Sequence, residues 1–244
     1  MNFLKKIVSP PPKGNGVFYS EMKSLLSFSP KNISLYEKAF THRSLKLEND
    51  KGESVNYERL EFLGDAMLGA VISSYLFKKV PTRTEGYLTQ MRSKIVSRES
   101  LNELGKDLDL IRFVRSKVKE SHIGDNIHGN IFEALIGAIY LDKGYDTCTK
   151  FIYDNVIAPH VDISKLESKI TSYKGLVIEW CQKIKKHYNI EVYEDTGNES
   201  IKHFSVKISI DGNFIAKGRA TSKKKAEEQA YKRVYYSFQK QISK

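Results

Sequence analysis

The sequence has few cysteines, since only Cys148 and Cys181 occur among its 244 residues. The two lie far apart, and neither has a CxxC or a Cys/His neighbourhood. This spacing argues against a structural zinc site and against a disulfide framework, and it is typical of proteins from a reducing cytosol. We therefore expect a cytoplasmic protein with two incidental buried thiols.

Long hydrophobic runs are also missing, because no segment approaches the ~20 apolar residues that a membrane helix needs. The first segment, MNFLKKIVSPPPKGNG, has an interrupted apolar patch and no small-residue cleavage site. We interpret residues 1–19 as a flexible tail rather than a secretory signal, and we expect no membrane partner. No arrangement of Ser, His and Asp, or of Cys and His, indicates nucleophilic catalysis by a side chain.

Charge is abundant but unevenly spread along the chain, whose formal net charge is +11. Residues 172–244 contain 15 Lys and Arg against 8 Asp and Glu, whereas residues 1–171 contain 25 against 21. A basic C-terminal third indicates a polyanionic partner, through electrostatic steering and counterion release. Surface solubility alone also accounts for such a balance, so the charge is only a weak indication.

The hydrophobic pattern divides the chain into two parts. Between residues 35 and 163, apolar residues recur at the i, i+3/i+4 spacing of helices. After residue 171, an amphipathic helix precedes three strand-like segments with turn signals between them, and a last helix follows the candidate N-cap Ser222. The sequence thus predicts an all-α domain and a small α+β domain of order α-β-β-β-α, with the bounds 20–163 for the first, 164–171 for a linker and 172–240 for the second.

Two groups of acidic residues stand among apolar ones. In NYERLEFLGDAML (56–68), Glu58, Glu61 and Asp65 share one stripe of the predicted helix, while Glu133 has Asn130 one turn before it. Oxygen ligands from two helices suit a hard cation such as Mg²⁺ or Mn²⁺. A buried salt-bridge cluster and an ordinary amphipathic helix with solvated acids remain alternatives at this stage.

Several stretches carry a resemblance to a known family. ERLEFLGDAML (58–68) resembles the signature of the ribonuclease III family, and the family's other recurring blocks have counterparts in the same order. The C-terminal α-β-β-β-α segment, which ends in TSKKKAEEQA, resembles the double-stranded RNA-binding domain of bacterial members. The resemblance covers residues 20–240 and implies a metal-dependent, homodimeric nuclease. The other matching blocks are AFTHRSL (39–45), EGYLTQMRSKIVSRESL (85–101) and FEALIGAIYLD (132–142).

The resemblance also implies roles for individual residues. Glu61, Asp65 and Glu133 match metal-binding carboxylates, with Asp65 and Glu133 as the catalytic pair. Glu58 matches a position near the RNA path and is not expected to be a ligand. Phe62 matches an aromatic residue that packs into a socket on a second subunit, although plain core packing is the alternative. The implied cofactor is Mg²⁺, for which Mn²⁺ can substitute, and no small organic cofactor is implied.

Asn130 departs from the family pattern, in which Asp usually stands three residues before the Glu of FEAL. Asn supplies a neutral carbonyl oxygen, so the site loses one negative charge and should bind the cation more weakly. Retained activity, a deliberate inactivating substitution and a degenerate protein that only binds RNA are the competing explanations. Because the three carboxylates are intact, we favour retained activity and keep Asn130 among the metal ligands.

The C-terminal domain is expected to contact duplex RNA through its phosphates and 2′-hydroxyl groups. Lysines at the start of the last helix combine their charge with the helix dipole, which favours phosphate. The segment between the first two strands carries a matching lysine, but the Pro and His that relatives often have before it are replaced. The residues expected to contact RNA are Glu179, Gln182, Lys202, Ser222, Lys223 and Lys224.

The sequence as a whole predicts an endoribonuclease that cleaves double-stranded RNA to 5′-phosphate and 3′-hydroxyl ends with short 3′ overhangs. Ribosomal RNA processing and mRNA turnover are the duties that the resemblance implies. The main alternative is a catalytically impaired duplex-binding protein, for which Asn130 would be the mark. A DNA-binding helical protein is disfavoured, because the C-terminal domain resembles a duplex-RNA fold.

Overall fold

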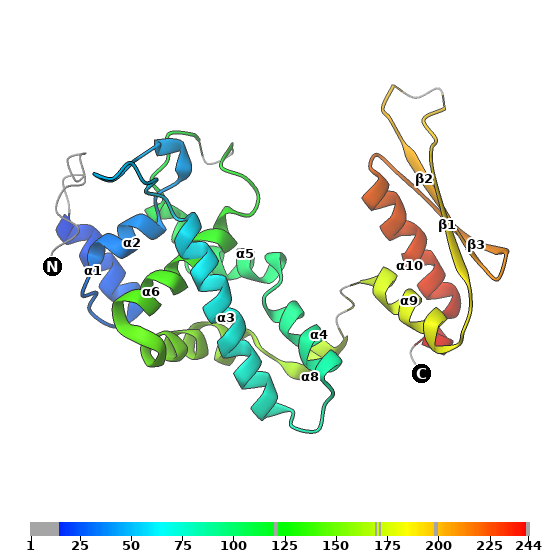
Figure 1. Cartoon of the computed structure of the whole chain (residues 1–244), viewed down its shortest axis with the longest axis horizontal. Helices are drawn as coiled ribbons and strands as arrows, with labels where there is room; N and C mark the ends of the chain where they lie inside the picture. Colours follow the sequence, from blue (N-terminus) through cyan, green and yellow to red (C-terminus); the bar gives the residue numbers. More distant parts are fainter. Residues whose placement is uncertain (1–14, 120–121, 169, 171, 198–199, 243–244) are drawn as a thin grey trace. The chain divides into compact units, whose positions relative to one another are not determined.

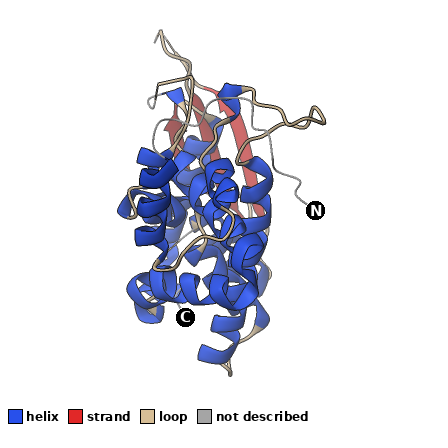
Figure 2. Ribbon diagram, turned by 90° about the vertical axis from the view of Figure 1, so that its left-hand side faces the viewer, coloured by secondary structure: helices blue, strands red, loops and turns tan. Residues whose placement is uncertain are grey.

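A computed structural model of the whole chain describes residues 15–119, 122–168, 170, 172–197 and 200–242. The chain forms two compact units, Met1–Ser168 and Lys169–Lys244. Strands occur only in the second unit among the described residues, and they belong to a single sheet (Figure 2). An all-helical domain followed by an α-β-β-β-α domain is therefore confirmed.

The N-terminal unit is a helical bundle in which α3 and α6 are the longest helices (Figure 1). Two isolated β-bridges, Thr41 with Arg115 and Glu48 with Ser54, join its loops. The helical elements are α1 (Asn15–Leu26), α2 (Ile33–Ala39), η1 (Arg43–Leu45), α3 (Glu58–Lys79), α4 (Glu85–Ile95), α5 (Arg98–Asp107), η2 (Leu110–Phe113), α6 (Ile127–Ile152), η4 (Tyr153–Ile157), α7 (Ala158–His160) and α8 (Ile163–Ser168).

Both ends of this unit are more ordered than the sequence indicated. Part of the predicted tail 1–19 is helical, because α1 begins at Asn15 and buries Met22 and Leu26 in the core; residues 1–14 lie outside the described part of the chain. Part of the predicted linker 164–171 belongs to α8, which ends at Ser168. The buried ammonium of Lys94 donates to the carbonyl oxygen of Leu166 at 2.7 Å, so α8 is attached to α4.

Glycines allow α3 and α6 to touch at their backbones. A Cβ atom at Gly64 would overlap the carbonyl oxygen of Glu133, and one at Gly137 would overlap that of Leu60. Gly105 of α5 meets the carbonyl oxygen of His128 in the same way. The three helices therefore approach more closely than side chains would permit, and this packing decides which polar residues meet.

Among the described residues, α3 is the one helix that is long and apolar enough, by length and composition, to cross a membrane. A core helix meets the same criterion, and α3 buries Leu68, Val71, Ile72 and Leu76 within the unit.

The C-terminal unit packs two helices against one face of an antiparallel sheet with strand order β1-β2-β3 (Figure 1). Val206, Ile208 and Ile210 alternate along β2 and are buried in a core with Trp180 and Tyr231. The first helix of this unit ends at Lys183, and the chain enters β1 at Tyr188. The elements are α9 (Tyr173–Lys183), β1 (Tyr188–Glu194), β2 (Phe204–Ile210), β3 (Asn213–Ala220) and α10 (Lys223–Ile242).

Candidate active site and nucleic-acid interface

An open cavity of about 460 Å³ lies where α3, α5 and the start of α6 meet. The amide oxygen of Asn102, on α5, accepts a 2.8 Å hydrogen bond from the backbone N–H of Gly129, which holds the first turn of α6 in place. All four predicted metal ligands line this cavity, from two helices. The lining residues are Glu58, Glu61, Phe62, Asp65, Val96, Arg98, Leu101, Asn102, Asn126, Gly129, Asn130 and Glu133.

Two carboxyl groups in the cavity, those of Glu61 and Glu133, have a raised pKa. Burial raises the pKa of Glu133 to about 7, and repulsion from Asp65 and Glu61 adds to the rise. Burial also raises the pKa of Glu61, with Glu58 and Asp65 contributing. Within the described residues, Glu61, Asp65 and Glu133 form no ion pair or side-chain hydrogen bond. A salt-bridge cluster and an ordinary solvated helix face therefore explain this site poorly.

Two residues near these carboxylates, Glu58 and Asn130, already interact with other side chains. Glu58 pairs with Arg43 at 3.4 Å, which leaves it less free than the others to bind a cation. Burial raises the pKa of Tyr57, and a hydrogen bond with the Asn130 side chain opposes that rise. Asn130 is thus in contact with a buried phenol as well as with the cavity.

The four predicted ligands have the chemistry of a hard-cation site, although their side chains do not converge on a single point. In the described part of the chain, no three His, Cys, Asp or Glu side chains lie close enough together to hold a metal ion. The open cavity leaves room for these side chains to move. Three carboxylates and one amide oxygen fit Mg²⁺ or Mn²⁺ better than softer metals.

Arg98, a residue that the sequence analysis did not single out, is the cation in the cavity lining. It opposes the pKa rise of both Glu61 and Glu133, so its guanidinium lies in their field. Arg98 is the first residue of α5, directly after the N-cap Ser97. A positive charge is unfavourable at a helix N-terminus, and this misplacement was the signal that could have drawn attention to Arg98.

Phe62 extends from α3 into solvent, with 80% of its surface exposed in the single chain. This exposure excludes packing into the chain's own core, the alternative that the sequence left open. A second cavity of about 360 Å³ lies further along α3 and is lined by Asp65, Ala66, Gly69, Ala70, Ser73, Arg92 and Val96. Phe62 is not among the residues that line this second cavity.

In the C-terminal unit, two of the predicted RNA-binding lysines contact the same aromatic ring. The ammonium nitrogens of Lys202 and Lys223 lie 5.4 and 5.6 Å from the centre of the Phe204 ring. Ser222 caps α10, as predicted, since its hydroxyl oxygen accepts from the N–H of Lys225 at 3.3 Å. Lys224 is exposed on the same turn.

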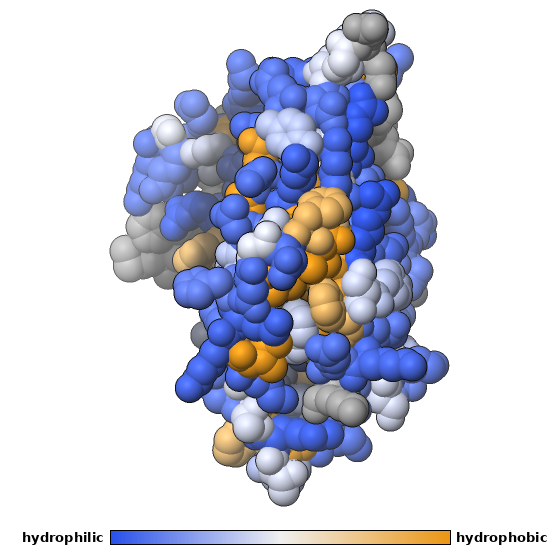
Figure 3. Space-filling view, turned by 90° about the vertical axis from the view of Figure 1, so that its right-hand side faces the viewer, coloured by the Kyte–Doolittle hydropathy of each residue, from blue (hydrophilic) through white to orange (hydrophobic). Residues whose placement is uncertain are grey.

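The remaining predicted contacts, Glu179 and Gln182, lie three residues apart on α9 and are both exposed. No described contact links them to the pair of lysines over Phe204. The face of the molecule in Figure 3 is mostly hydrophilic, with a smaller hydrophobic area near its middle.

Comparisons with known proteins agree with this division of the chain. A family model described as ribonuclease-III-like matches residues 32–160, and one described as double-stranded RNA binding motif matches residues 173–235. Ribonuclease 3 of Zunongwangia profunda is 59% identical over 243 residues, which covers 100% of both proteins. The chain belongs to the ribonuclease III family.

Other relatives support this ribonuclease III assignment. Ribonuclease 3 of Flavobacterium psychrophilum is 57% identical over 243 residues and covers 99% of both proteins. The crystal structure of the nuclease domain of ribonuclease III from Campylobacter jejuni is 32% identical, with a TM-score of 0.51; the match covers 59% of this chain and 97% of that one. This ribonuclease III is therefore an endoribonuclease specific for double-stranded RNA, and the alternative of an inactive binding protein is not favoured.

Proposed function

We propose that Glu61, Asp65, Asn130 and Glu133 hold Mg²⁺, for which Mn²⁺ can substitute, and that this site hydrolyses the phosphodiester bonds of duplex RNA. The proposal is supported by one observation above all. Three carboxylates and Asn130 line a single cavity from two helices, and the pKa of Glu133 is raised to about 7 among acids that Arg98 compensates only in part. Such a cluster costs stability unless a cation is to be bound there.

In this proposal Asp65 and Glu133 are the catalytic pair, as the family resemblance implies, and both line the cavity beside the contact between α3 and α6. The bound cation would polarise the attacking water and stabilise the charge that develops on the phosphate oxygens. Glu61 completes the carboxylate set, and Arg98 supplies a guanidinium suited to a phosphate oxygen of the RNA. The products are 5′-phosphate and 3′-hydroxyl ends.

Asn130 contributes an amide oxygen in place of a carboxylate. With one negative charge fewer, the site binds the cation more weakly but keeps four oxygen donors. The contact with Tyr57 restrains the amide group, so that its orientation does not depend on the cation alone.

We further propose a homodimer in which Phe62 packs into the partner subunit. Its exposed aromatic ring and the hollow further along α3 support this. A crystal structure of the Campylobacter jejuni nuclease domain is described as flexible in a region involved in dimer formation. Two sites related by a two-fold axis would each cut one strand and leave short 3′ overhangs.

Duplex RNA would be held by the C-terminal unit through Glu179, Gln182, Lys202, Ser222, Lys223 and Lys224. The lysines at the start of α10 and the basic charge of the unit support phosphate binding. The biological roles that we propose are ribosomal RNA processing and the turnover of structured mRNA in the cytoplasm.

A cleavage assay on duplex RNA tests the metal site directly. The wild-type protein, Asn130→Asp and Glu133→Ala would each be compared with Mg²⁺, with Mn²⁺ and without a divalent cation. We expect wild type and Asn130→Asp to cleave only with a divalent cation, and Glu133→Ala to lose cleavage while it still binds RNA. If wild type and Asn130→Asp are both inert while binding persists, the interpretation as an enzyme is wrong, whereas cleavage by Glu133→Ala would contradict the site assignment.

A further inference from the structure

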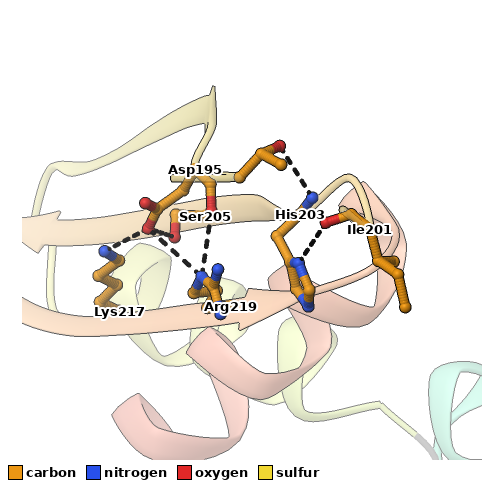
Figure 4. Close-up of polar contacts among 7 residues, drawn as sticks. Asp195, Ile201, His203, Ser205, Lys217 and Arg219 are labelled. Carbon is orange, nitrogen blue, oxygen red and sulfur yellow. Dashed lines mark hydrogen bonds and ion pairs between the residues drawn. The ribbon is translucent and has the colours of Figure 1, made fainter. Parts of the chain in front are cut away.

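Asp195, the residue that follows β1, connects all three strands of the C-terminal sheet (Figure 4). Its carboxylate accepts a 2.6 Å hydrogen bond from the hydroxyl of Ser205 on β2 and pairs at 2.7 Å with the ammonium of Lys217 on β3. Its backbone carbonyl accepts from Nε of Arg219 at 3.1 Å. Ser205 is fully buried beneath these side chains, so its hydroxyl depends on Asp195 as a partner.

The same residue closes the base of the segment between β1 and β2. The backbone N–H of Asp195 donates to the carbonyl oxygen of His203 at 2.9 Å. The N–H of His203 donates to the hydroxyl of Thr196 at 3.1 Å, and its ring nitrogen Nδ1 lies 2.8 Å from the carbonyl oxygen of Ile201 (Figure 4). Both ends of the connection are therefore attached at Asp195.

This attachment acts on the residues that stand next to it in sequence. Lys202 precedes His203, and Phe204 lies between His203 and Ser205, both of which bond to Asp195 or its neighbour Thr196. The ring of Phe204 carries the ammonium of Lys202 at 5.4 Å and that of Lys223 at 5.6 Å. A lysine from the connection and a lysine from α10 are thereby held over one ring.

Each of the two ammonium groups lies close to the ring of Phe204, which attracts a cation. Lys202 also forms a 2.6 Å ion pair with Glu194. These contacts depend on where the backbone places Lys202 and Phe204. Lys202 therefore keeps its position at the Phe204 ring only while the base of the connection stays fixed.

We infer that Asp195 is a positioning residue for RNA binding, which fixes the base of the β1–β2 connection and so holds Lys202 at the Phe204 ring, which Lys223 also contacts, to receive an RNA phosphate. The inference rests on the proposed role of these two lysines. It assigns Asp195 no contact with RNA, since its carboxylate is already engaged by Ser205 and Lys217.

Asp211 provides a matched comparison at the opposite end of β2. Its carboxylate accepts from the N–H of His187 at 3.0 Å and pairs with Lys186 at 3.1 Å. Both aspartates thus join a hydrogen bond with a lysine pair, and hydrogen bonds lower the pKa of both. Asp211 fixes the turn before β3, which lies away from Lys202, Phe204 and Lys223.

The experiment measures binding of a blunt RNA duplex to the full chain over a range of salt concentrations. The variant Glu133→Gln serves as the background, so that the RNA is not cut. Asp195→Ala, Asp211→Ala and Lys202→Ala are compared alone, and Lys202→Ala is then combined with each aspartate variant. Asp195→Asn keeps an acceptor for Ser205 and serves as the conservative replacement, and circular dichroism monitors the fold of each variant.

We expect Asp195→Ala to weaken binding about threefold to tenfold and to lower the salt slope by about one, as the loss of a single phosphate contact does. In the Asp195→Ala protein, adding Lys202→Ala should weaken RNA binding little further. In the Asp211→Ala protein, adding Lys202→Ala should weaken RNA binding by its full amount. Asp195→Asn should recover most of the affinity.

Two results would overturn the inference, and they differ in meaning. If Lys202→Ala weakens binding equally with and without Asp195, then Asp195 does not position it, although the lysine assignment stands. If Lys202→Ala has no effect in any protein, the proposed RNA contact fails and takes the inference with it.

Discussion

The two units treat their acidic side chains in opposite ways. In the cavity of the nuclease unit, burial and mutual repulsion raise the pKa of Glu61 and Glu133, and neither has an ion-pair partner among the described residues. In the C-terminal unit, Asp195 and Asp211 each pair with a lysine, and hydrogen bonds lower the pKa of both.

This difference fits the proposal that the acids of the C-terminal unit maintain the fold whereas those of the cavity serve a reaction. A carboxylate with a lowered pKa stabilises the folded state whenever it is ionised, so its presence needs no function beyond structure. A carboxylate with a raised pKa destabilises the folded state when ionised, and such residues persist mainly at sites that bind or react. Experiments on either unit can test this contrast between the two kinds of carboxylate.

The largest effect is expected from Gly64→Ala, which acts on the contact that brings the acids together. The added Cβ would overlap the backbone of Glu133, which cannot rotate away as a side chain would. We expect a loss of about 3 kcal/mol in the free energy of unfolding, together with loss of cleavage. Thermal unfolding followed by circular dichroism, and the duplex cleavage assay, measure the two.

The control for that substitution is Gly86→Ala, in the exposed first turn of α4, where an added Cβ would meet nothing within 4 Å. Its unfolding free energy should change by less than about 1 kcal/mol, in the stabilising direction, because Ala favours a helix. Equal behaviour of the two variants would mean that α3 and α6 are not in backbone contact.

A second prediction concerns the stability of the metal-free protein against pH. The Glu133 carboxyl releases its proton near its ordinary pKa in the unfolded chain but only near pH 7 in the folded one. Stability is therefore lost as pH rises through that interval, and the loss is complete above it. Above pH 7, Glu133→Gln should be more stable than wild type by about 1–2 kcal/mol, a value reduced for the water that reaches the cavity.

Urea unfolding in EDTA, at about pH 5 and about pH 8, measures this difference between the two proteins. The gain of Glu133→Gln should nearly vanish at the lower pH. Added Mg²⁺ should stabilise wild type more than the variant, since only wild type keeps the full ligand set. A gain that is the same at both pH values would show that the glutamate carries no raised pKa.

Much of the site could be predicted because helical spacing is local information. The i, i+4 relation of Glu61 and Asp65 places them on one face whatever the surroundings, and the position of Asn130 one turn before Glu133 does the same. That both pairs would meet in one cavity followed from the family resemblance, and the structure places them there through the contact at Gly64.

Other features could not be predicted, because they depend on contacts between distant parts of the chain. Arg98 reaches the cavity only because α5 packs on the start of α6, and Tyr57 meets Asn130 across the junction of α3 and α6. The segment that forms α8 is polar and charged, so its sequence predicts a linker. The helix is attached through a hydrogen bond from the distant, buried Lys94, which the local sequence does not indicate. Such tertiary partners leave no periodic trace in sequence.

A third prediction concerns the basic residues of the C-terminal unit. Replacing Lys223 and Lys224 by Ala should weaken duplex binding about tenfold and lower the salt slope by about two. Replacing Lys232 and Lys240 by Ala removes the same charge from later turns of α10 and serves as the control. Titrations at several salt concentrations measure both slopes. If both double variants lose the same affinity for RNA, the lysines at the helix start contribute only through the net charge of the unit.

The smallest effect is expected from Asn130→Asp, which adds an ionisable ligand to the cavity. The Mg²⁺ concentration for half-maximal cleavage should fall about threefold to tenfold, because a further negative charge strengthens binding of the cation. The change should be modest because, in the proposed site, the amide oxygen of Asn130 already serves as a ligand and only its charge is missing. Cleavage rates measured against Mg²⁺ at constant ionic strength give the value.

Asn126→Asp is the matched control for that change, since Asn126 lines the same cavity one turn before Asn130 and is bonded to Asn102. It adds an equal charge without a new ligand. If direct ligation matters, Asn130→Asp must lower the Mg²⁺ requirement more than Asn126→Asp does. Equal shifts would mean that the cavity attracts the cation by its overall field, and the four-ligand assignment would then lose Asn130.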